Sequence, residues 1–343
     1  MTLAISLPRA RRRRRTCGLV IGLALLAIAV LLSLAIGSRT LAPGDVLEAF
    51  RSFDRHDDAH LIVREMRVPR TLVAILAGLA LGLAGAIMQA VTRNPLAEPG
   101  LLGINAGAAL AVIAGAAAFG MTSMASYVWF AFLGAGLAGT AVFLLGQAHE
   151  TTTNPVRLVL AGAGVSVLLA SVTGVIILNA PAEVFDQFRH WASGSIERAD
   201  FNAVAVLGLA VPPGALAALA IVGNLNVLAL GRDLGQALGA SVRGTWLLAC
   251  VAVMLLAGAA TAGAGPIAFV GLVAPHLARL LVGPDYRWLL PYSALFAAVL
   301  LLVADVLGRV VGGSTEIAAG IIAALLGGPF FIAVVRKYRL NKL

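Results

Sequence analysis

Charged residues are scarce in this chain of 343 residues: only 12% are Asp, Glu, Lys or Arg, whereas 60% are hydrophobic. No charged residue occurs between Glu98 and Glu150. Other charge-free gaps span residues 158–182, 203–231, 244–278, 289–304 and 317–335. A soluble core cannot cover so much apolar surface, and a membrane-spanning helix needs about 20 apolar residues. The composition therefore predicts a polytopic membrane protein and excludes an ordinary soluble domain.

Lysine and cysteine are almost absent. The lysines are Lys337 and Lys342, and neither lies in the G-x-x-x-x-G-K-[ST] loop that binds ATP phosphates, so we expect no P-loop in this chain. The cysteines, Cys17 and Cys250, fall in or beside apolar runs and are expected to pack as small hydrophobic side chains. Two cysteines support neither a disulfide framework nor a thiolate metal site.

The apolar runs lack the period-two alternation of a membrane β-barrel, so the spans are predicted to be helices. We expect an all-α fold with ten transmembrane helices in a single domain over residues 17–336. The predicted spans are 17–38, 66–91, 100–120, 125–147, 156–178, 203–222, 244–264, 268–280, 288–311 and 317–335. The eighth is too short to cross about 30 Å of hydrocarbon alone. It must therefore be a half-helix or be shielded by protein.

The arginine distribution predicts the orientation. Residues 11–15 are five consecutive arginines before an apolar run, which favours an anchored first helix over its alternative, a cleaved signal peptide. With ten spans, the inside segments carry 16 of the 25 Lys and Arg residues, and the outside segments carry 12 of the 16 acidic residues. The tails, residues 1–16 and 337–343, are therefore predicted to be cytoplasmic, and a basic arm for nucleic acid is not expected beside a span.

Three polar segments lie between the predicted spans. Residues 39–65 hold six acids and four arginines, which is typical of a folded amphipathic surface. Residues 183–200 have the pattern of a short amphipathic helix on the outer surface. Residues 224–243 form an inside loop with a helical pattern, in which four leucines fall near one face: Leu228, Leu230, Leu234 and Leu238.

Glycine is abundant, with 38 residues. Two sets fall on single helix faces: Gly78, Gly82 and Gly85, and Gly134, Gly136 and Gly139. Small residues let helices approach closely in lipid, where hydrophobic burial does not drive association. We therefore interpret these faces as tight helix contacts rather than pore linings.

The stretch RNPLAEPGLLG, residues 93–103, is unusually polar for its position between two apolar runs. Pro95 and Pro99 stop helix continuation and favour a tight turn. Backbone groups that lose their helix partners need others, which Asn94 and Asn105 can supply. The residues alone predict a rigid cytoplasmic turn and assign it no further role.

Five motifs occur in order along the chain. They are RVPR (67–70), GAIMQAVTRNPLAEPGLLGINAGA (85–108), GPIAFVGLVAPHLARLLVGPDYRWLLP (265–291), ADVLGR (304–309) and GGPFF (327–331). Across residues 60–336 their order and spacing resemble the FecCD-type permease subunits of ATP-driven importers for iron-siderophores, haem and vitamin B12. The resemblance implies a vitamin B12-importer-like permease fold, in the cytoplasmic (inner) membrane.

The resemblance also implies partners. Two permease chains would enclose a pathway, two cytoplasmic P-loop ATPase subunits would drive it, and an extracytoplasmic substrate-binding protein would dock outside. It implies no cofactor, no metal site and no enzymatic activity in this chain. The implied substrate is a ferric siderophore, with haem or vitamin B12 as the alternative.

Docking residues carry over from two of the motifs. Arg67 and Arg70 of RVPR, and Arg309 of ADVLGR, would face acidic residues of the docked binding protein. One alternative is that these arginines snorkel at a membrane edge. Another, for Arg309, is an i,i+4 ion pair with Asp305.

The resemblance places the ATPase contact in the inside loop and the pathway along the fifth span. The coupling residues would be Gln236, Ala237, Leu238, Gly239 and Ala240. The pathway candidates are Gln89, Asn105, Ser166, Ser171 and Thr173, because polar groups in spans must face protein or water. Hydrogen bonds between helices are the alternative explanation for these residues.

The stretch VAPHLARLLVGPD, residues 273–285, looks at first like a metal or catalytic motif. His276 has no second His, Cys or carboxylate at ligand spacing, which excludes a zinc site of the usual kind. Pro275 is expected to end the eighth helix near the inner face. His276 and Arg279 would then cap and anchor the turn.

One position departs from the family pattern. The last span of the family usually begins with Glu-x-Pro-x-Gly, and here Glu316 and Gly320 are present while Ala318 stands at the proline position. We therefore expect the start of this helix to be less sharply fixed.

Two other classes of membrane protein are alternatives to an importer permease. An ion-coupled secondary transporter would need ionisable residues in mid-span, but Asp and Glu occur only near the ends of the predicted spans. A membrane enzyme would need clustered His, Asp or Glu at the membrane face, and the five histidines are scattered. Dependence of transport on a P-loop partner and a binding protein separates the three classes.

Overall fold

The computed structural model describes residues 6–37, 39–121, 124–146, 155–229, 235, 237–239, 241–313 and 315–340. Its elements, in chain order, are α1 (Ser6–Ala35), α2 (Pro43–Arg51), α3 (Asp58–Leu61), η1 (Ile62–Arg67), α4 (Val68–Thr92), η2 (Pro99–Leu102), α5 (Ile104–Phe119), α6 (Met124–Leu145), α7 (Pro155–Asn179), α8 (Ala182–Ala192), α9 (Phe201–Ala220), α10 (Val222–Leu228), α12 (Val242–Ala264), α13 (Val270–Val282), α14 (Tyr286–Gly312) and α15 (Ala319–Leu340). No strand occurs in these described ranges.

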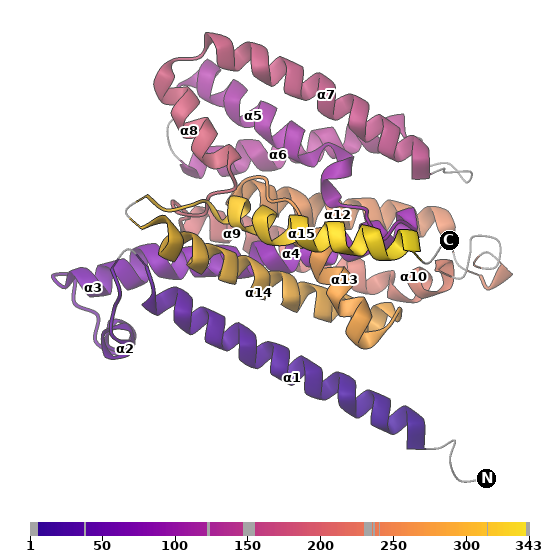
Figure 1. Cartoon of the computed structure of the whole chain (residues 1–343). Helices are drawn as coiled ribbons and strands as arrows, with labels where there is room; N and C mark the ends of the chain where they lie inside the picture. The colour runs from indigo at the N-terminus through magenta and orange to yellow at the C-terminus, as the bar shows by residue number, and fades with distance from the viewer. Residues whose placement is uncertain are drawn as a thin grey trace.

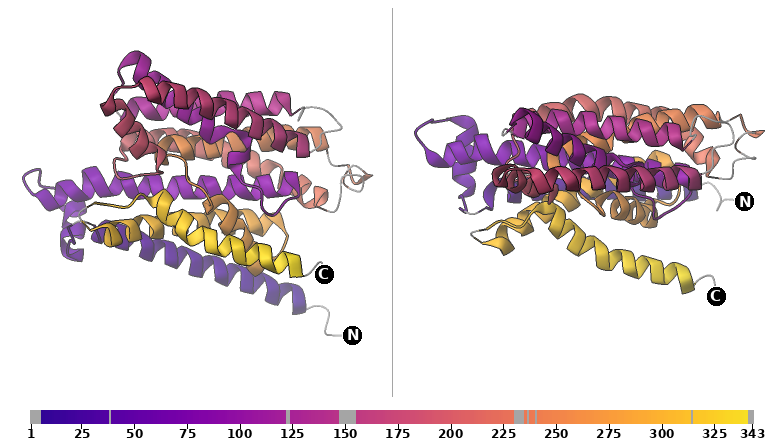
Figure 2. Two further views of the ribbon diagram at one scale, coloured as in Figure 1. Left: turned by 45° about the horizontal axis from the view of Figure 1, so that its top comes forward. Right: turned by 90° about the horizontal axis from the view of Figure 1, so that it is seen from above.

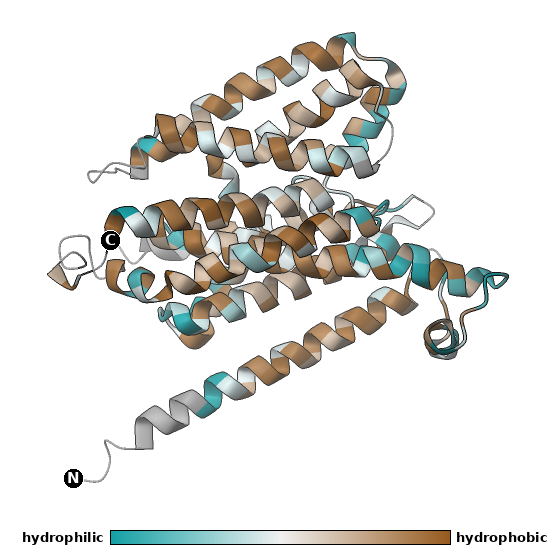
Figure 3. Cartoon of the chain, turned by 180° about the vertical axis from the view of Figure 1, so that it is seen from behind, coloured by the Kyte–Doolittle hydropathy of each residue, from teal (hydrophilic) through white to brown (hydrophobic). Residues whose placement is uncertain are grey.

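Each of the ten predicted spans corresponds to an apolar helix, which confirms the all-α expectation. Seven helical stretches are long and apolar enough to cross a membrane: α1, the continuous helix from α3 to α4, α6, α7, α9, α12 and α14. Three further helices, α5, α13 and α15, have shorter apolar segments. Hydrophilic residues gather at the two ends of the bundle, and apolar residues cover the helices between them (Figure 3).

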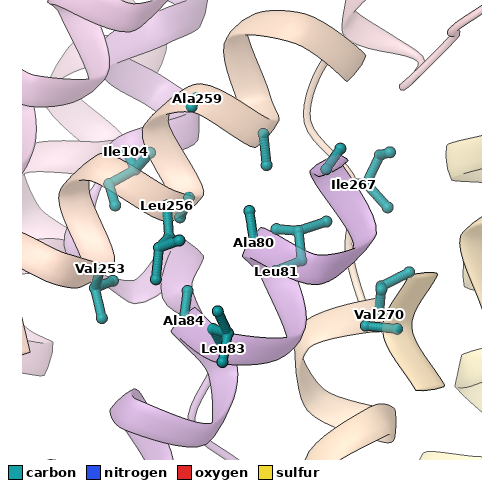
Figure 4. Close-up of a cluster of buried hydrophobic side chains, with 14 of the residues drawn as sticks. Ala80, Leu81, Leu83, Ala84, Ile104, Val253, Leu256, Ala259, Ile267 and Val270 are labelled. Atoms are coloured by element: carbon teal, nitrogen blue, oxygen red, sulfur yellow. The ribbon is translucent and has the colours of Figure 1, made fainter. Parts of the chain in front are cut away.

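The centre of the bundle is formed by α4 and α12, and α1 and α7 lie at opposite edges (Figure 1). Each of these helices has one most apolar window of 18 residues. In this window 72% is buried for α4 and for α12, against 22% for α1 and 11% for α7. Figure 4 shows alanines of α4, such as Ala80 and Ala84, close to Leu256 and Ala259 of α12. Small residues on α4 thus let it lie close to several neighbours at once.

The bundle has two distinct ends, which we name by their contents (Figures 1 and 2). At the tail end, α1 begins, α15 ends, and α10 lies beside them. At the cap end lie α2, α3, α8 and the connection from α14 to α15. The described parts of the predicted inside and outside segments therefore lie at opposite ends, as the ten-span topology requires.

The segment 39–65 is a folded surface, as predicted. Its helices α2 and α3 pack on the end of α1 through a small apolar cluster: Leu34, Leu41, Val46, Ala49, Ala59 and Val63. The chain then continues through η1, a π-helical stretch, directly into α4. The helix that carries the second span therefore begins before the predicted residue 66. Pro69 lacks the N–H that would bond to the carbonyl of Glu65, and widening the preceding turn relieves the clash of its ring with that carbonyl.

The predicted glycine faces are close helix contacts. A Cβ added to Gly78 would lie 2.5 Å from Ala298 Cα. One on Gly82 would lie 2.2 Å from the Ser293 carbonyl oxygen, and one on Gly85 would lie 1.7 Å from the Gly271 carbonyl oxygen. In α6, a Cβ on Gly134 would lie 2.3 Å from the Gly107 oxygen, whereas Gly136 has nothing within 4 Å. The tight-packing interpretation is confirmed for these faces except at Gly136.

The eighth span, α13, is a half-helix that starts inside the protein, as its length predicted. Its 13 residues cover only about 20 Å. The prediction that Pro275 ends this helix is wrong, because α13 continues past it to Val282. Pro275 cannot bond to the carbonyl of Gly271. That carbonyl instead abuts the bare Cα of Gly85, so the proline is accommodated by a close contact between helices.

Helix α1 is an integral part of the fold. Near its C-terminal end Ser33 Oγ and Thr71 Oγ1 share a hydrogen bond of 2.8 Å, and Gly18 faces Tyr292 of α14. The helix already starts at Ser6, within the predicted tail. Cys250 is buried, as expected, but Cys17 is exposed, so the prediction that it packs as a small hydrophobic side chain is wrong.

Candidate functional site

At the cap end, Arg67, Arg70 and Arg309 gather around two acidic side chains, and Arg70 and Arg309 bond to them directly. Arg70 Nε donates to Asp305 Oδ1 at 2.9 Å and its NH2 donates to the same oxygen at 2.7 Å. Its NH1 donates to Glu316 Oε2 at 2.7 Å. Asp305 is only 1% exposed. Arg70 therefore joins α4 to α14 and to the start of α15 through charge-assisted hydrogen bonds.

Arg309 and Arg67 extend this network to α1. Arg309 NH2 donates to Asp305 Oδ2 at 2.6 Å and to Ser33 Oγ at 2.9 Å, and its NH1 donates to the carbonyls of Ser33 and Ile36. Arg67 donates to the Leu34 carbonyl at 2.6 Å and to the Arg39 carbonyl. The carbonyls at the end of a helix carry partial negative charge, so the guanidinium groups are favourable partners for the end of α1.

These residues line a cavity of about 570 Å³ that we call the arginine pocket. Its lining includes Arg39, Arg67, Arg70 and Arg309 together with the acids Glu197 and Glu316. Arg39 is exposed, and His190 on the wall lies 3.2 Å from Glu197. Four cations against two lining carboxylates and the buried Asp305 make the pocket net positive. A concave, positively charged surface of this kind can receive an acidic side chain.

The structure brings together all three predicted docking arginines, but as largely buried groups. Arg67, Arg70 and Arg309 are 5%, 8% and 3% exposed. The i,i+4 pair of Arg309 with Asp305 is confirmed by a contact of 2.6 Å. Burial inside a network is not snorkelling, because the guanidinium groups bond to protein rather than reach for solvent. Direct contact of these arginines with a docked protein stays a prediction.

The polar stretch 93–103 forms the predicted turn. Arg93 ends α4 in the left-handed conformation, and Asn94 Oδ1 accepts from Leu96 N at 2.9 Å. Pro95 is half-buried, while the buried Pro99 starts η2 and packs on Gly271. The turn is therefore held by its own side chains and by α13.

Asn105 and Glu98 tie this turn to its neighbours. Asn105 Oδ1 accepts from Thr261 Oγ1 of α12 at 2.9 Å, which is a hydrogen bond between helices rather than a backbone cap. The Glu98 carboxyl accepts a hydrogen bond from the backbone of Phe269, just before α13. Burial raises the pKa of Glu98, and this hydrogen bond opposes part of the rise. The turn thus fixes the start of the half-helix.

His276 and Arg279 lie on α13 rather than at its end. The buried ring of His276 meets Phe330 of α15 edge-on, with 5.6 Å between the ring centroids. Arg279 is hydrogen-bonded to the Tyr286 side chain, and its carbonyl accepts from Gly283 N at 3.0 Å. Both residues thus tie α13 to its neighbours, whereas their predicted role in capping the turn after the helix stays a prediction. Within the described part of the chain, no group of three His, Cys, Asp or Glu residues could hold a metal.

The pathway candidates do not gather in one place. Gln89 is buried in α4 and donates to the Leu272 carbonyl at 3.3 Å. In α7, Ser171 and Thr173 donate to their own helix, to the carbonyls of Val167 and Leu169. Ser166 is half-buried near Gly103. The hydrogen bonds of Ser171 and Thr173 are thus intrahelical, and a role for these residues along a pathway stays a prediction.

The predicted coupling segment lies at the tail end. Gln236 and Ala240 fall outside the described residues, as do Leu230 and Leu234. Ala237, Leu238 and Gly239 are exposed, and Gly239 has a positive φ of 83°. Leu238 is 60% exposed but Leu228 is buried, so the expectation that both share one face is wrong. Residues 224–228 belong to α10, whose Leu225 and Leu228 pack into the core.

The last helix begins immediately after Ala318. The Ala318 carbonyl accepts from Ile321 N and Ile322 N, and Gly320 N donates to the Gly194 carbonyl at 3.0 Å. A Cβ on Gly320 would lie 2.7 Å from the Ser193 carbonyl oxygen. This close contact with the turn after α8 sets the helix start without a proline. That turn lies within the predicted outer segment 183–200, whose first part is the helix α8, with Phe188 and Trp191 buried.

Sequence reasoning missed the acidic half of the arginine network. The sequence indicates Asp305 only as a partner of Arg309, and Glu316 only as part of a motif. Their position was a usable indication: Asp305 and Glu316 both lie beside apolar spans. An unpaired carboxylate is costly there, so a basic partner is expected.

The fold and these two polar ends define a class of protein. A bundle of apolar helices, with a half-helix started by an irregular turn and polar groups paired internally, is typical of a multi-pass membrane protein. The model of the FecCD transport family matches residues 25–337. The chain belongs to this family, and it is a permease subunit of an ATP-binding-cassette (ABC) importer.

Curated relatives match along nearly the whole chain. The ferric enterobactin transport system permease protein FepD of Escherichia coli is 45% identical over 316 residues, covering 92% of this chain and 93% of that protein. The hemin transport system permease protein HmuU of Yersinia pestis is 36% identical, covering 90% and 94%. A solved metal-chelate type ABC transporter in an inward-facing conformation has a TM-score of 0.78 at 27% identity, covering 93% of this chain and 98% of that one.

Proposed function

We propose that this permease carries a ferric siderophore across the cytoplasmic membrane. The observation that supports this substrate best is the 45% identity to a ferric enterobactin permease over 92% of the chain. A relative named for iron(3+)-hydroxamate import, from Bacillus subtilis, is 37% identical over 95% of the chain. Haem is the second candidate, because the hemin permease is also 36% identical.

A second permease chain, identical or related, would complete the pathway. The helices α7 and α15 lie toward the same side of the bundle (Figures 1 and 2), and both expose large apolar side chains. These include Leu168, Val175 and Leu178 on α7, and Ile321, Leu325 and Ile332 on α15. An apolar face of this extent fits a partner helix surface. The exposed Ser171 then faces the space between the two chains.

Two P-loop ATPase subunits would bind at the tail end, which is cytoplasmic in this proposal. Arginines accumulate at this end: Arg13, Arg14, Arg15, Arg93, Arg157, Arg243, Arg279, Arg287 and Arg336. This bias fits the positive-inside rule. The exposed Leu238 is the side chain that the ATPases would contact, and ATP hydrolysis would occur in those subunits.

The coupling role predicts a selective loss on substitution of Leu238. We expect Leu238→Ser to weaken co-purification of the ATPases by about tenfold or more, because an apolar contact at an interface centre is lost. ATP-dependent uptake of a radioiron-labelled ferric siderophore by reconstituted vesicles should fall with it. Both are measured on the tagged permease, extracted from its native host in mild detergent.

The matched control is Leu47→Ser in α2, the same change at the cap end. Leu47 is 49% exposed and Leu238 is 60% exposed. If both variants retain the ATPases equally, the coupling assignment is wrong. If no ATPase accompanies the unaltered chain and none stimulates uptake, the importer function itself fails and an ion-coupled transporter takes its place. Uptake of haem in preference to the ferric siderophore would reverse the order of substrates.

The substrate-binding protein would dock at the cap end, with an acidic side chain in the arginine pocket. Arg39 tests this proposal without disturbing the buried network, because its side chain is exposed while lining the pocket. We expect Arg39→Glu to weaken binding of the cognate binding protein about tenfold at low salt, since like charges would then meet. Surface plasmon resonance on nanodisc-embedded permease gives the affinity.

Arg51→Glu is the matched control for docking. Arg51 is also exposed at the cap end, at the end of α2, but it does not line the pocket. Equal weakening by both substitutions would mean that only the overall charge of this end matters. The pocket would then not be the docking point.

A further inference from the structure

A second large cavity lies at the tail end, between α1 and the α13–α14 pair. Its volume is about 650 Å³. Helix α1 crosses α14 at two glycines: a Cβ on Gly18 would lie 2.4 Å from the Tyr292 hydroxyl oxygen, and one on Gly22 would lie 2.5 Å from Leu295 Cδ2. The cavity lies beside this crossing, and we call it the α1 groove. It is separate from the arginine pocket, which lies at the other end of the bundle.

The mouth of the α1 groove is basic. Arg14 and Arg15 both line it. Arg15 makes three contacts within the protein. Its NH2 donates to the Val282 carbonyl at 2.5 Å, and its NH1 lies 3.7 Å from Asp285 Oδ2. Its guanidinium carbon lies 5.7 Å from the centroid of the Trp288 ring. Arg14, by contrast, is exposed. Its charge is therefore directed at the opening.

Deeper along α1 the walls of the groove become wholly apolar. On α1 they include Ile21 and Leu25, which are 60% and 49% exposed. On α13, Leu280 and Leu281 are 66% and 68% exposed and form the apolar side of the mouth, just before Val282. Trp288 and Tyr292 mark the level at which the change occurs, because such aromatic rings favour the membrane interface. The Tyr292 hydroxyl donates to the Arg15 carbonyl at 2.5 Å, which fixes both at this level. The groove thus runs from headgroup depth into the hydrocarbon.

We propose that the α1 groove binds an anionic phospholipid of the leaflet at the tail end. Its phosphate would pair with Arg14, and one acyl chain would lie against Ile21 and Leu25 on one side and Leu281 on the other. Basic pockets between membrane helices favour anionic over zwitterionic headgroups, because each basic side chain near the surface adds electrostatic attraction. The lipid would fill the space beside a helix that packs sparsely, since only 22% of the apolar window of α1 is buried.

Native mass spectrometry of the full chain in mild detergent tests this site with defined lipids. The probes are phosphatidylglycerol, phosphatidylethanolamine and glycerophosphoglycerol, the last being the headgroup without acyl chains. We expect phosphatidylglycerol to bind best and Arg14→Gln to weaken it about fivefold. The matched control is Arg13→Gln, because Arg13 is exposed on the same helix but does not line the groove.

A second pair of variants tests the apolar wall. Leu25→Trp should fill the groove and weaken phosphatidylglycerol binding, while Leu31→Trp, which is 64% exposed outside the groove, should not. Size-exclusion chromatography confirms that each variant is folded. Equal losses for Arg13→Gln and Arg14→Gln would overturn the site in favour of diffuse attraction. Equal binding of phosphatidylethanolamine, or tight binding of the headgroup alone, would overturn the anionic phospholipid as its occupant.

Discussion

Replacing Asp305 by asparagine should lower the free energy of unfolding by about 3–5 kcal/mol. The side chain is 1% exposed and accepts hydrogen bonds from both Arg70 and Arg309. Asparagine keeps the shape but removes the negative charge, so two buried guanidinium groups lose their shared counter-ion. Glu316 compensates Arg70 only in part, because it contacts one of its nitrogens. Unfolding of the purified chain in mixed detergent–SDS micelles measures the change.

Asp186→Asn is the control for this prediction. Asp186 pairs with Arg189 at 3.4 Å on the surface of α8, and both side chains are well exposed. Exposed pairs of this kind contribute little to stability. We therefore expect no measurable shift in the unfolding midpoint. A small effect for Asp305→Asn, similar to that for Asp186→Asn, would show that the arginine network does not hold the cap end together.

The second large effect is expected at Gly85. Gly85→Ala places a methyl group 1.7 Å from the Gly271 carbonyl oxygen, and that oxygen belongs to the backbone, so no side chain can rotate away. The two helices must separate, which should cost about 3 kcal/mol or prevent folding. The yield of monodisperse protein and the SDS unfolding midpoint both report this change.

Gly174→Ala in α7 makes the same chemical change where nothing lies within 4 Å. Alanine has the higher helix propensity, by about 1 kcal/mol, so this variant should be at least as stable as the parent. If Gly85→Ala behaves like Gly174→Ala, the contact between α4 and α13 is looser than described. The close contact would then not explain how Pro275 is accommodated.

The helices could be predicted because lipid imposes a simple rule on sequence. A span must be apolar over about 20 residues, so the charge-free gaps placed all ten. The eighth span was recognisable as a half-helix because it is shorter than these 20 residues. The start of this helical stretch at Asp58, ahead of α4, was not, because charged residues such as Arg64 and Glu65 interrupt the apolar pattern on a helix that has already begun.

Long-range pairing was beyond the reach of a single sequence. Arg70 is 235 residues from Asp305, and no local pattern joins them. The prediction that Pro275 ends its helix failed for a related reason. The effect of this proline depends on Gly85, which lies on another helix and leaves room for the Gly271 carbonyl. Local rules describe what one segment prefers, whereas these positions depend on a neighbour that only the fold supplies.

The glycine contacts also determine where the molecule can deform. Backbone pressed on backbone cannot yield by changing rotamers, so α4, α13 and α14 form one stiff block, and α5 with α6 form another through Gly107 and Gly134. The second block meets α12 partly through Met254, whose flexible thioether lies 2.8 Å from the position of a Cβ on Gly139. Shape changes during transport should therefore occur as shear where the second block meets α12, with compliant side chains such as Met254 absorbing the displacement.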